Sequence, residues 1–161
     1  MNDDPDVETF WREACAACGL DPATSHDVFA FGDSPELADE LAALVADGPK
    51  RATAGLSAAY AYDQVPLPQV GGHSIALDGQ GRPAALIRTT EVRVAPFSSV
   101  DSSFAWDEGE GDRSLEFWKR AHEAFFRREC ARIDIVWSES VAVVFERFRL
   151  IYPQPTNQPP G

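Results

Sequence analysis

Apolar residues recur at three- and four-residue spacing in three segments of the chain, and each segment is predicted to be a helix. The first runs from about residue 6 to residue 18 and stops before Gly19, a residue type that favours helix ends. The second opens at residues 34–36, where serine provides a cap, proline fits the first turn and glutamate faces the positive end of the helix dipole. The third follows Ser114 and reaches about residue 128.

Alternating and β-branched residues predict strands in the remaining apolar segments. Asp78-Gly79-Gln80-Gly81 is typical of a hairpin turn between two of these strands. The glycine-punctuated acidic segment 107–112 is expected to be a loop. The expected strands or extended pieces are residues 28–31, 73–78, 84–94, 133–137 and 141–152. Hairpins and irregular spacing favour an α+β fold, a small mostly antiparallel β-barrel with about three flanking helices.

The length of 161 residues is that of one domain. We expect residues 1–24 to be an amino-terminal helical extension packed on a domain of residues 25–152. Residues 153–161 hold four prolines and no core candidates, so they are expected to be a Pro-rich flexible tail.

The charge of the chain limits its partners. Fourteen Lys and Arg against 26 Asp and Glu give a net charge of −12, which leaves few cations for the many phosphate contacts of a bound duplex. A small ligand, or a short single-stranded nucleic acid segment held in a local pocket, fits this charge better than duplex DNA, and an acidic surface that only aids solubility is an alternative. The acidic amino terminus and the absence of a long apolar run predict a cytoplasmic protein without membrane contact. We expect a monomer or a homodimer.

No metal or cofactor is expected. Cys15 and Cys18 form a C-x-x-C inside a predicted helix, where buried structural cysteines are the favoured interpretation, and a zinc site would need two more ligands. The acidic segment 107–112 matches no metal-loop signature. The chain contains no nucleotide-binding or hydrolase motif of the common kinds.

Residues 48–53 are the first candidate for chemistry, because Lys50, Arg51 and Thr53 follow a helix end directly. In a regular strand, positions three apart face opposite sides. Lys50 and Thr53 can therefore cooperate only where the backbone turns, and the preceding Gly-Pro makes a turn plausible. The alternative is an exposed basic loop.

Gly48-x-Lys50-x-x-Thr53 resembles the G-x-K-x-x-T/E signature of the ASCH domain superfamily, which has a PUA-like fold. The similarity covers roughly residues 28–152 and departs at Gly55, where longer members often have serine. The segments that carry it are Phe31-Gly32-Asp33, Leu37-Ala38-Asp39-Glu40-Leu41, Leu67-Pro68 with Gly71, Thr90-Glu91-Val92, Phe104-Ala105, Glu108-Gly109-Glu110-Gly111-Asp112, Trp118 and His122 to Phe126.

The resemblance implies a small β-barrel with a cleft lined by the signature loop, and a link to RNA or its nucleosides. Two activities are attributed to such proteins: hydrolysis of the acetamide of N4-acetylcytidine, and cleavage of RNA. The signature carries Lys50 and Thr53 over as catalytic residues. The glutamate that works with them is assigned to Glu110, with Glu108 as the second choice.

The roles of these residues stay open at the level of the sequence. Thr53 could be the nucleophile with Lys50 as its base, if burial lowers the lysine pKa. If Glu110 instead pairs with Lys50, the lysine becomes the donor to the oxyanion and Glu110 the base for Thr53 or a water. A ribonuclease, or a non-catalytic module that only holds a phosphate, are the rival functions. The expected substrate-binding residues are Arg51 for phosphate and Tyr60, Tyr62 and Trp106 for base stacking, although each aromatic ring could instead belong to the core or its rim.

Overall fold

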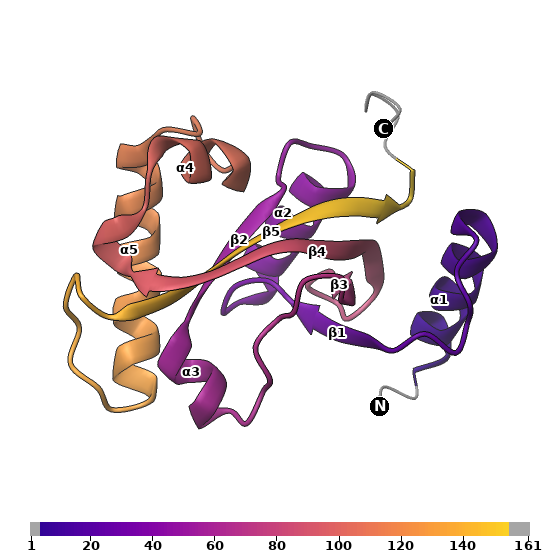
Figure 1. Ribbon diagram of the computed structural model, residues 1–161, viewed down its shortest axis with the longest axis horizontal. Coiled ribbons are helices and arrows are strands. Elements are labelled where there is room, and N and C mark those ends of the chain that lie inside the picture. Colours follow the sequence, from indigo (N-terminus) through magenta and orange to yellow (C-terminus); the bar gives the residue numbers. More distant parts are fainter. Residues whose placement is uncertain (1–3, 155–161) are drawn as a thin grey trace. The chain divides into compact units, whose positions relative to one another are not determined.

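The computed structural model describes residues 4–154, and Figure 1 shows the order of its elements. The helices and strands are α1 Pro5–Cys18, β1 His26–Ala30, α2 Pro35–Ala46, β2 Ala52–Leu56, α3 Ser57–Tyr62, β3 His73–Leu77, β4 Pro83–Pro96, the 3-10 helix η1 Phe97–Ser99, α4 Ser102–Glu108, α5 Leu115–Arg132 and β5 Ala142–Tyr152. No helix within residues 4–154 is long and apolar enough to cross a membrane. The predicted tail at 153–161 lies outside the described residues from position 155 on.

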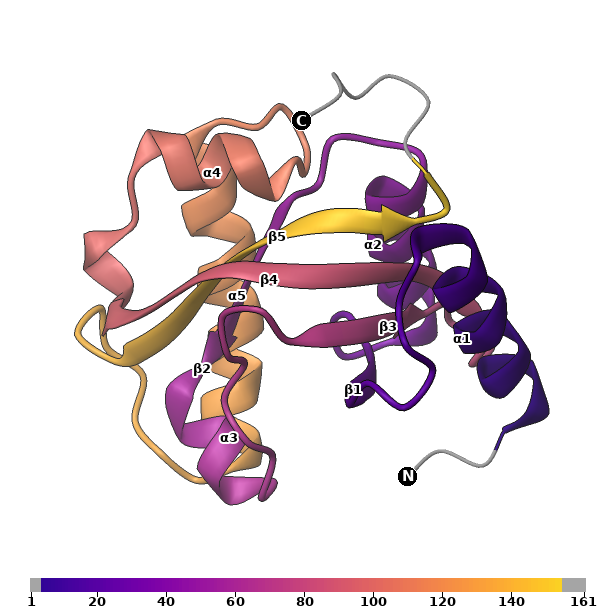
Figure 2. The ribbon, with the colours of Figure 1, turned by 45° about the vertical axis from the view of Figure 1, so that its right-hand side comes forward.

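The strands form one sheet in the order β1-β3-β4-β5-β2. β1 runs parallel to β3, whereas the β3–β4 and β2–β5 pairs are antiparallel. Figure 2 shows β4 and β5 lying side by side. The α+β class with a mostly antiparallel sheet is confirmed. The predicted small barrel is an open, curled half-barrel, because β1 and β2 are edge strands of the sheet formed by residues 4–154.

Residues 4–154 form five α-helices, not about three. α3 was missed because it is only six residues long and lacks a side-chain cap at its start. α4 was missed because it ends inside the acidic segment read as a loop: Asp101 caps its first turn, and Gly109, with φ 71°, stops it.

The strand predicted at 133–137 is also wrong, because these residues close the last turn of α5. Asp134 has φ 60°, a left-handed conformation, and Ile135 N donates back to Cys130 O at 2.9 Å. Ile135 and Val136 are exposed, so their β-branched side chains do not mark a buried strand.

The chain divides into two compact units. Among the described residues the first comprises 4–48, 71–88 and 149–154, and the second comprises 49–70 and 89–148. In the first unit, α1 buries Trp11 and Ala14 in a cluster with Ile75 of β3 and Leu86 of β4. The Trp11 ring stacks on His26 with centroids 3.8 Å apart.

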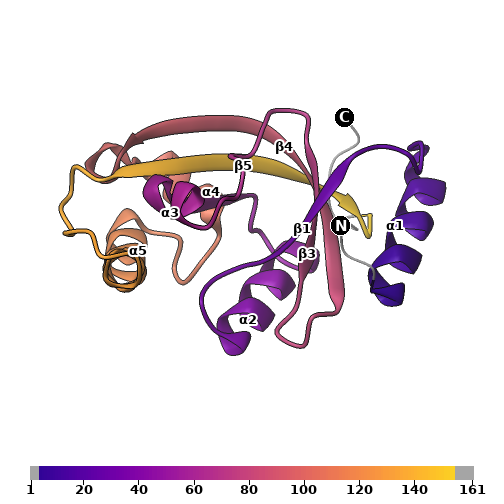
Figure 3. The same cartoon turned by 90° about the horizontal axis from the view of Figure 1, so that it is seen from below.

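The core of the second unit lies between α4, α5 and one face of β2 and β5. Ala52 and Leu56 of β2 and Phe145 of β5 are buried there with Phe104 of α4 and Trp118 of α5. Figure 3 shows α5 nearly end-on, on one side of the β4 and β5 ribbons. Because side chains alternate along a strand, the Thr53 side chain points to the face of the sheet that is turned away from this core, and Gly55 lies on that same face.

Candidate functional site

A buried lysine bonded to two glutamates is the centre of the candidate site. Lys50 is completely buried, and its Nζ donates to Glu108 Oε1 at 2.5 Å, to Glu110 Oε2 at 2.8 Å and to Ala52 O at 2.8 Å. Glu108 is also fully buried, whereas the Glu110 side chain keeps 16% of its surface exposed. The ammonium therefore uses its three hydrogens within the protein, and Glu110 is the member of the group that reaches solvent.

Backbone contacts hold these side chains in place. Arg51 N donates to Asp107 O at 2.7 Å, which joins the segment before β2 to the end of α4. A Cβ on Gly109 would lie 2.8 Å from the N and Cα of Lys50, so only glycine allows this close approach. The sequence Glu-Gly-Glu thus places a carboxylate on each side of a glycine that packs against the lysine backbone.

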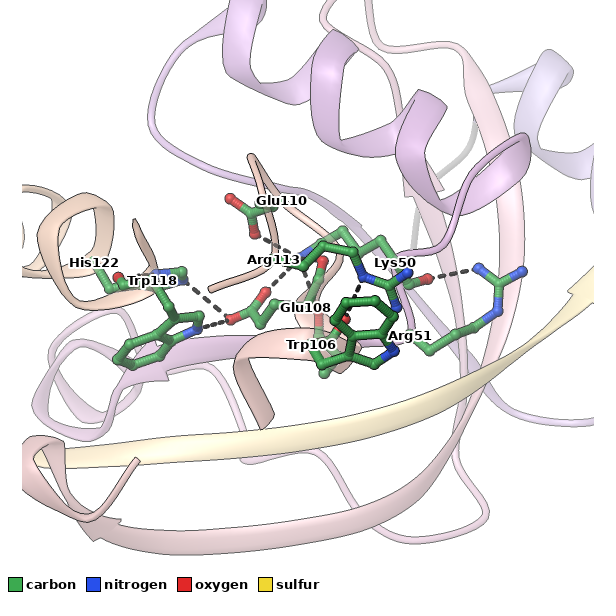
Figure 4. Close-up of polar contacts among 9 residues, drawn as sticks. Lys50, Arg51, Trp106, Glu108, Glu110, Arg113, Trp118 and His122 are labelled. Atoms are coloured by element: carbon green, nitrogen blue, oxygen red, sulfur yellow. Dashed lines mark hydrogen bonds and ion pairs between the residues drawn. The ribbon is translucent and has the colours of Figure 1, made fainter. Parts of the chain in front are cut away.

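Two residues of α5 complete the network, as Figure 4 shows. Glu108 Oε2 accepts from Trp118 Nε1 at 2.9 Å and lies 3.0 Å from His122 Nε2. The other ring nitrogen, His122 Nδ1, lies 2.9 Å from Trp118 O. Both partners of His122 are acceptors, so both ring nitrogens carry a proton and the side chain is an imidazolium.

The charges of this network explain the direction of each pKa shift. Burial alone would lower the pKa of Lys50, but Glu108 and Glu110 raise it above its ordinary value. Burial likewise opposes the charge on His122, and Glu108 raises its pKa. For Glu108, burial is outweighed by Lys50 and His122, which hold its pKa well below the usual range. Burial raises the pKa of Glu110 despite the attraction of Lys50.

Thr53 does not join this network. It lies in β2, opposite Glu146 of β5, on the face of the sheet turned away from α4 and α5. Within residues 4–154 no hydrogen bond links its hydroxyl to Lys50, Glu108 or Glu110. Thr53 could meet Lys50 only if the backbone between them were turned. The extended strand already begins at Ala52, so Thr53 is held on the other face of the sheet.

The four residues expected to bind substrate lie in different places. Arg51 is half-buried, and its Nη1 donates to Lys50 O at 2.6 Å. Trp106 of α4 is 56% exposed, and the Arg113 guanidinium lies 3.7 Å above its ring centroid. Tyr62 is exposed at the end of α3, and Tyr60, in the same helix, packs over Gly55. Figure 4 shows Arg51, Trp106 and Arg113 drawn with the Lys50 network.

Glu108, Glu110 and His122 also have the composition of a metal site, since their ligand atoms lie within 4.8 Å of one another. Lys50 Nζ already donates to both carboxylates, and a second cation there would be repelled by the ammonium and by the imidazolium. The chemistry of the donor set therefore favours the lysine ion pair over a metal.

Sequence reasoning missed the partners contributed by α5. Trp118 and His122 had no place among the catalytic or substrate-binding residues predicted from the sequence. Trp118 and His122 are four residues apart and therefore lie on one face of the helix. This spacing was the feature of the sequence that could have indicated their shared contact with Glu108. Glu146 and Thr89, which share a 2.6 Å hydrogen bond, were also missed; the signal was a charged residue inside the apolar run of β5.

Comparison with known proteins gives matches over most of the chain. The family model of the ASCH domain matches residues 27–152. The crystal structure of an ASCH domain from Lactobacillus crispatus JV V101 is similar at 30% identity and a TM-score of 0.83, covering 92% of this chain and 96% of that one. Protein EF3133 from Enterococcus faecalis V583 is 35% identical with a TM-score of 0.80, covering 91% of this chain and 88% of that one. No curated protein matches.

Proposed function

Because the chain belongs to the ASCH domain family, whose members generally bind RNA, we propose that it hydrolyses an amide on a modified pyrimidine nucleoside such as N4-acetylcytidine. The resemblance seen in the sequence is confirmed at the level of the family and its PUA-like fold. The observation that carries the proposal is a partly exposed carboxylate, Glu110, bonded to the fully buried Lys50.

Glu110 has the properties of a general base. Its pKa is raised by burial, which brings a carboxylate closer to the basicity that proton abstraction near neutral pH requires. In the proposed step Glu110 takes a proton from water while the water oxygen attacks the acetamide carbonyl carbon. Collapse of the tetrahedral intermediate breaks the C–N bond, and the proton passes from Glu110 to the departing nitrogen, which leaves acetate and cytidine.

Lys50 is the donor to the oxyanion in this proposal, not the base. Its raised pKa keeps the ammonium charged, which excludes it from taking a proton. When Glu110 becomes protonated it loses its negative charge, and its bond to Lys50 weakens. The Lys50 hydrogen that faced Glu110 can then turn to the developing oxyanion, so one proton transfer both activates the water and provides the stabilising donor. Water replaces Thr53 as the nucleophile, because Thr53 makes no hydrogen bond to Glu110 within residues 4–154.

Glu110→Gln is expected to reduce the release of cytidine from N4-acetylcytidine by about 100-fold or more, since the amide cannot accept the proton. The rate would be followed by chromatography of the nucleosides. The matched control is Glu139→Gln, an exposed acid, which should leave the rate unchanged. The hydrolase proposal fails if the wild-type protein releases no cytidine or if both variants turn over equally.

Cleavage of single-stranded RNA is a second candidate, and the exposed Trp106 favours it. One face of its ring is covered by Arg113, and 56% of the residue's surface is exposed, which suits stacking with an unpaired base. In this reaction Glu110 would take the proton of a ribose 2′-hydroxyl while the hydroxyl oxygen attacks the adjacent phosphorus. The P–O5′ bond would break, leaving a 2′,3′-cyclic phosphate, and the proton would pass from Glu110 to the departing 5′-oxygen.

Trp106→Ala is expected to weaken the binding of single-stranded RNA by about 1–3 kcal/mol, which is the contribution of one base–aromatic stack. Fluorescence anisotropy with a labelled RNA measures the affinity. Tyr62→Ala removes another exposed ring and should have little effect. A loss confined to Tyr62→Ala would place the stacking surface on α3 and contradict the assignment to α4.

A further inference from the structure

A second polar group lies on the face of the sheet turned away from the α4–α5 core. Glu146 of β5 stands directly opposite Thr53 of β2, so their side chains are neighbours on one face. From β4, the Thr89 hydroxyl donates to Glu146 Oε2 at 2.6 Å. The three residues thus form a row across β4, β5 and β2, all within the second unit.

Glu146 is an unusual residue for its position. It is only 8% exposed and Thr89 only 3%, yet no cation pairs with the carboxyl group among residues 4–154. The next residue, Arg147, points to the other face and bonds to Asp107 and Glu91. Burial of a carboxyl without a cation is unfavourable, and an apolar residue there would suit the strand better. Stability therefore does not account for Glu146.

Tyr60 borders this row. A Cβ on Gly55 would lie 2.9 Å from both Cε2 and Oη of Tyr60, so the glycine makes room for the ring. Burial, with a smaller effect from the nearby Glu146 carboxylate, raises the pKa of Tyr60 to about 12. Tyr60 therefore keeps its phenol proton and offers an aromatic face and a hydroxyl beside Glu146.

We propose that Glu146, with Thr53, Tyr60 and Thr89, forms a second site that binds a nucleobase by its hydrogen-bonding edge. A carboxylic acid places an O–H donor beside a C=O acceptor, which matches the adjacent donor and acceptor of a Watson–Crick edge. Unpaired bases are recognised in RNA-binding proteins by such edge contacts together with aromatic stacking. The inference rests on the binding of RNA or nucleosides in the proposed function and does not depend on amide hydrolysis.

The buried surroundings of Glu146 shift its equilibrium toward the neutral form, which suits this chemistry. Burial raises the pKa of its carboxyl group, and the hydrogen bond from Thr89 only partly opposes that effect. The neutral acid can donate as well as accept, as a carboxyl held neutral in an apolar environment does in some enzymes. Thr89, Thr53 and Tyr60 are the polar groups that face Glu146 from β4, β2 and α3, and none of them is charged near neutral pH.

Binding of free nucleosides to the full chain tests the site by isothermal titration calorimetry. Cytidine and uridine are expected to bind, and 3-methyluridine, whose edge is blocked, about tenfold or more weakly. Glu146→Leu is expected to lose cytidine affinity by a similar factor. Glu146→Gln keeps a donor and an acceptor, so it should bind cytidine equally at all pH values, whereas the wild-type affinity should fall as the carboxyl ionises with rising pH.

The proposal is overturned if Glu146→Leu binds cytidine as the wild type does, if 3-methyluridine binds as uridine does, or if Glu146→Gln loses as much affinity as Glu146→Leu. If Glu146→Leu does not fold, the pH dependence of cytidine affinity in Glu146→Gln and in the wild type still tests the site, because only the wild-type affinity should fall with rising pH. Glu110→Gln separates this site from the hydrolase: it should lose turnover and keep cytidine binding. If cytidine binding depends on Glu146 but no cytidine is released from N4-acetylcytidine, the proposed hydrolase activity is contradicted and the proposed Glu146 site is not.

Discussion

Lys50→Met is expected to lower the free energy of unfolding by about 3–5 kcal/mol, because removal of one partner leaves buried charges uncompensated. Methionine has a similar length but cannot donate, so Glu108 and Glu110 would face each other without the ammonium that separates their charges. The backbone oxygen of Ala52 would also lose its donor. Urea unfolding followed by circular dichroism measures the change.

Two further variants isolate the cause of that loss. Lys119→Met makes the same change at an exposed position of α5 and should alter stability by less than about 0.5 kcal/mol. Adding Glu110→Gln to Lys50→Met removes one of the two stranded carboxylates and should recover part of the stability. Equal stability of Lys50→Met and wild type would mean that the ion pairs of Lys50 are not what holds this part of the second unit.

The proximity of Lys50 to Glu108 and Glu110 could be predicted from the sequence. Gly48 and Pro49 end α2 and bring the chain to Lys50, and the family signature links that position to the acidic segment. The Glu-Gly-Glu spacing then makes both Glu108 and Glu110 available to one ammonium. The helix end and the Glu-Gly-Glu spacing are local features, and the link between Lys50 and the acidic segment comes from the family motif. Features of both kinds can be recognised in a single sequence.

The separation of Thr53 from Lys50 could not be predicted in the same way. It depends on where β2 begins, because a shift of one residue would move Thr53 to the α4–α5 face. Strand boundaries are set by pairing with β5, a strand about ninety residues later in the chain, and not by the residues of β2 itself. The position of Glu146 beside Thr53 follows from the same register.

The role of His122 depends on tertiary packing in a similar way. Its helix position is evident from the sequence, but its contact with Glu108 requires α5 to face the end of α4 with one particular rotation. The Trp118 ring stacks on the His122 ring at a centroid distance of 4.0 Å and fixes that rotation within the core. No local pattern carries this information.

Glu108→Gln is expected to destabilise the protein by about 3–5 kcal/mol and to flatten the pH dependence of its stability. Glu108 lies between two cations, Lys50 and His122, and its neutral replacement leaves both buried without their shared partner. In the wild type, Glu108 raises the pKa of His122 above its ordinary value of 6.5, so the folded state binds that proton more tightly than the unfolded state.

The sign of the pH effect follows from these directions. The stabilisation from His122 is fully present below pH 6.5 and is lost as pH rises through its higher folded-state pKa. Glu110, whose pKa is raised above 4.5, acts in the same direction at lower pH. Glu108, with its lowered pKa, stabilises the fold above pH 4.5 and loses that effect as acid protonates it. Together Glu108 and His122 stabilise the fold most between pH 4.5 and 6.5.

Urea unfolding at pH 5.5 and pH 8 is therefore expected to show a more stable wild type at pH 5.5, and a smaller difference between the two conditions for Glu108→Gln. An NMR titration of His122 should show its pKa falling in that variant, because the ring loses the carboxylate that holds its proton. His73→Gln is the matched control: burial lowers the pKa of His73, so its removal should not reduce the advantage at low pH. A pKa below 6.5 for His122 in the wild type would contradict the assignment of His122 as an imidazolium. It would also contradict the alternation of charge along His122, Glu108, Lys50 and Glu110 on which the position of Glu110 depends.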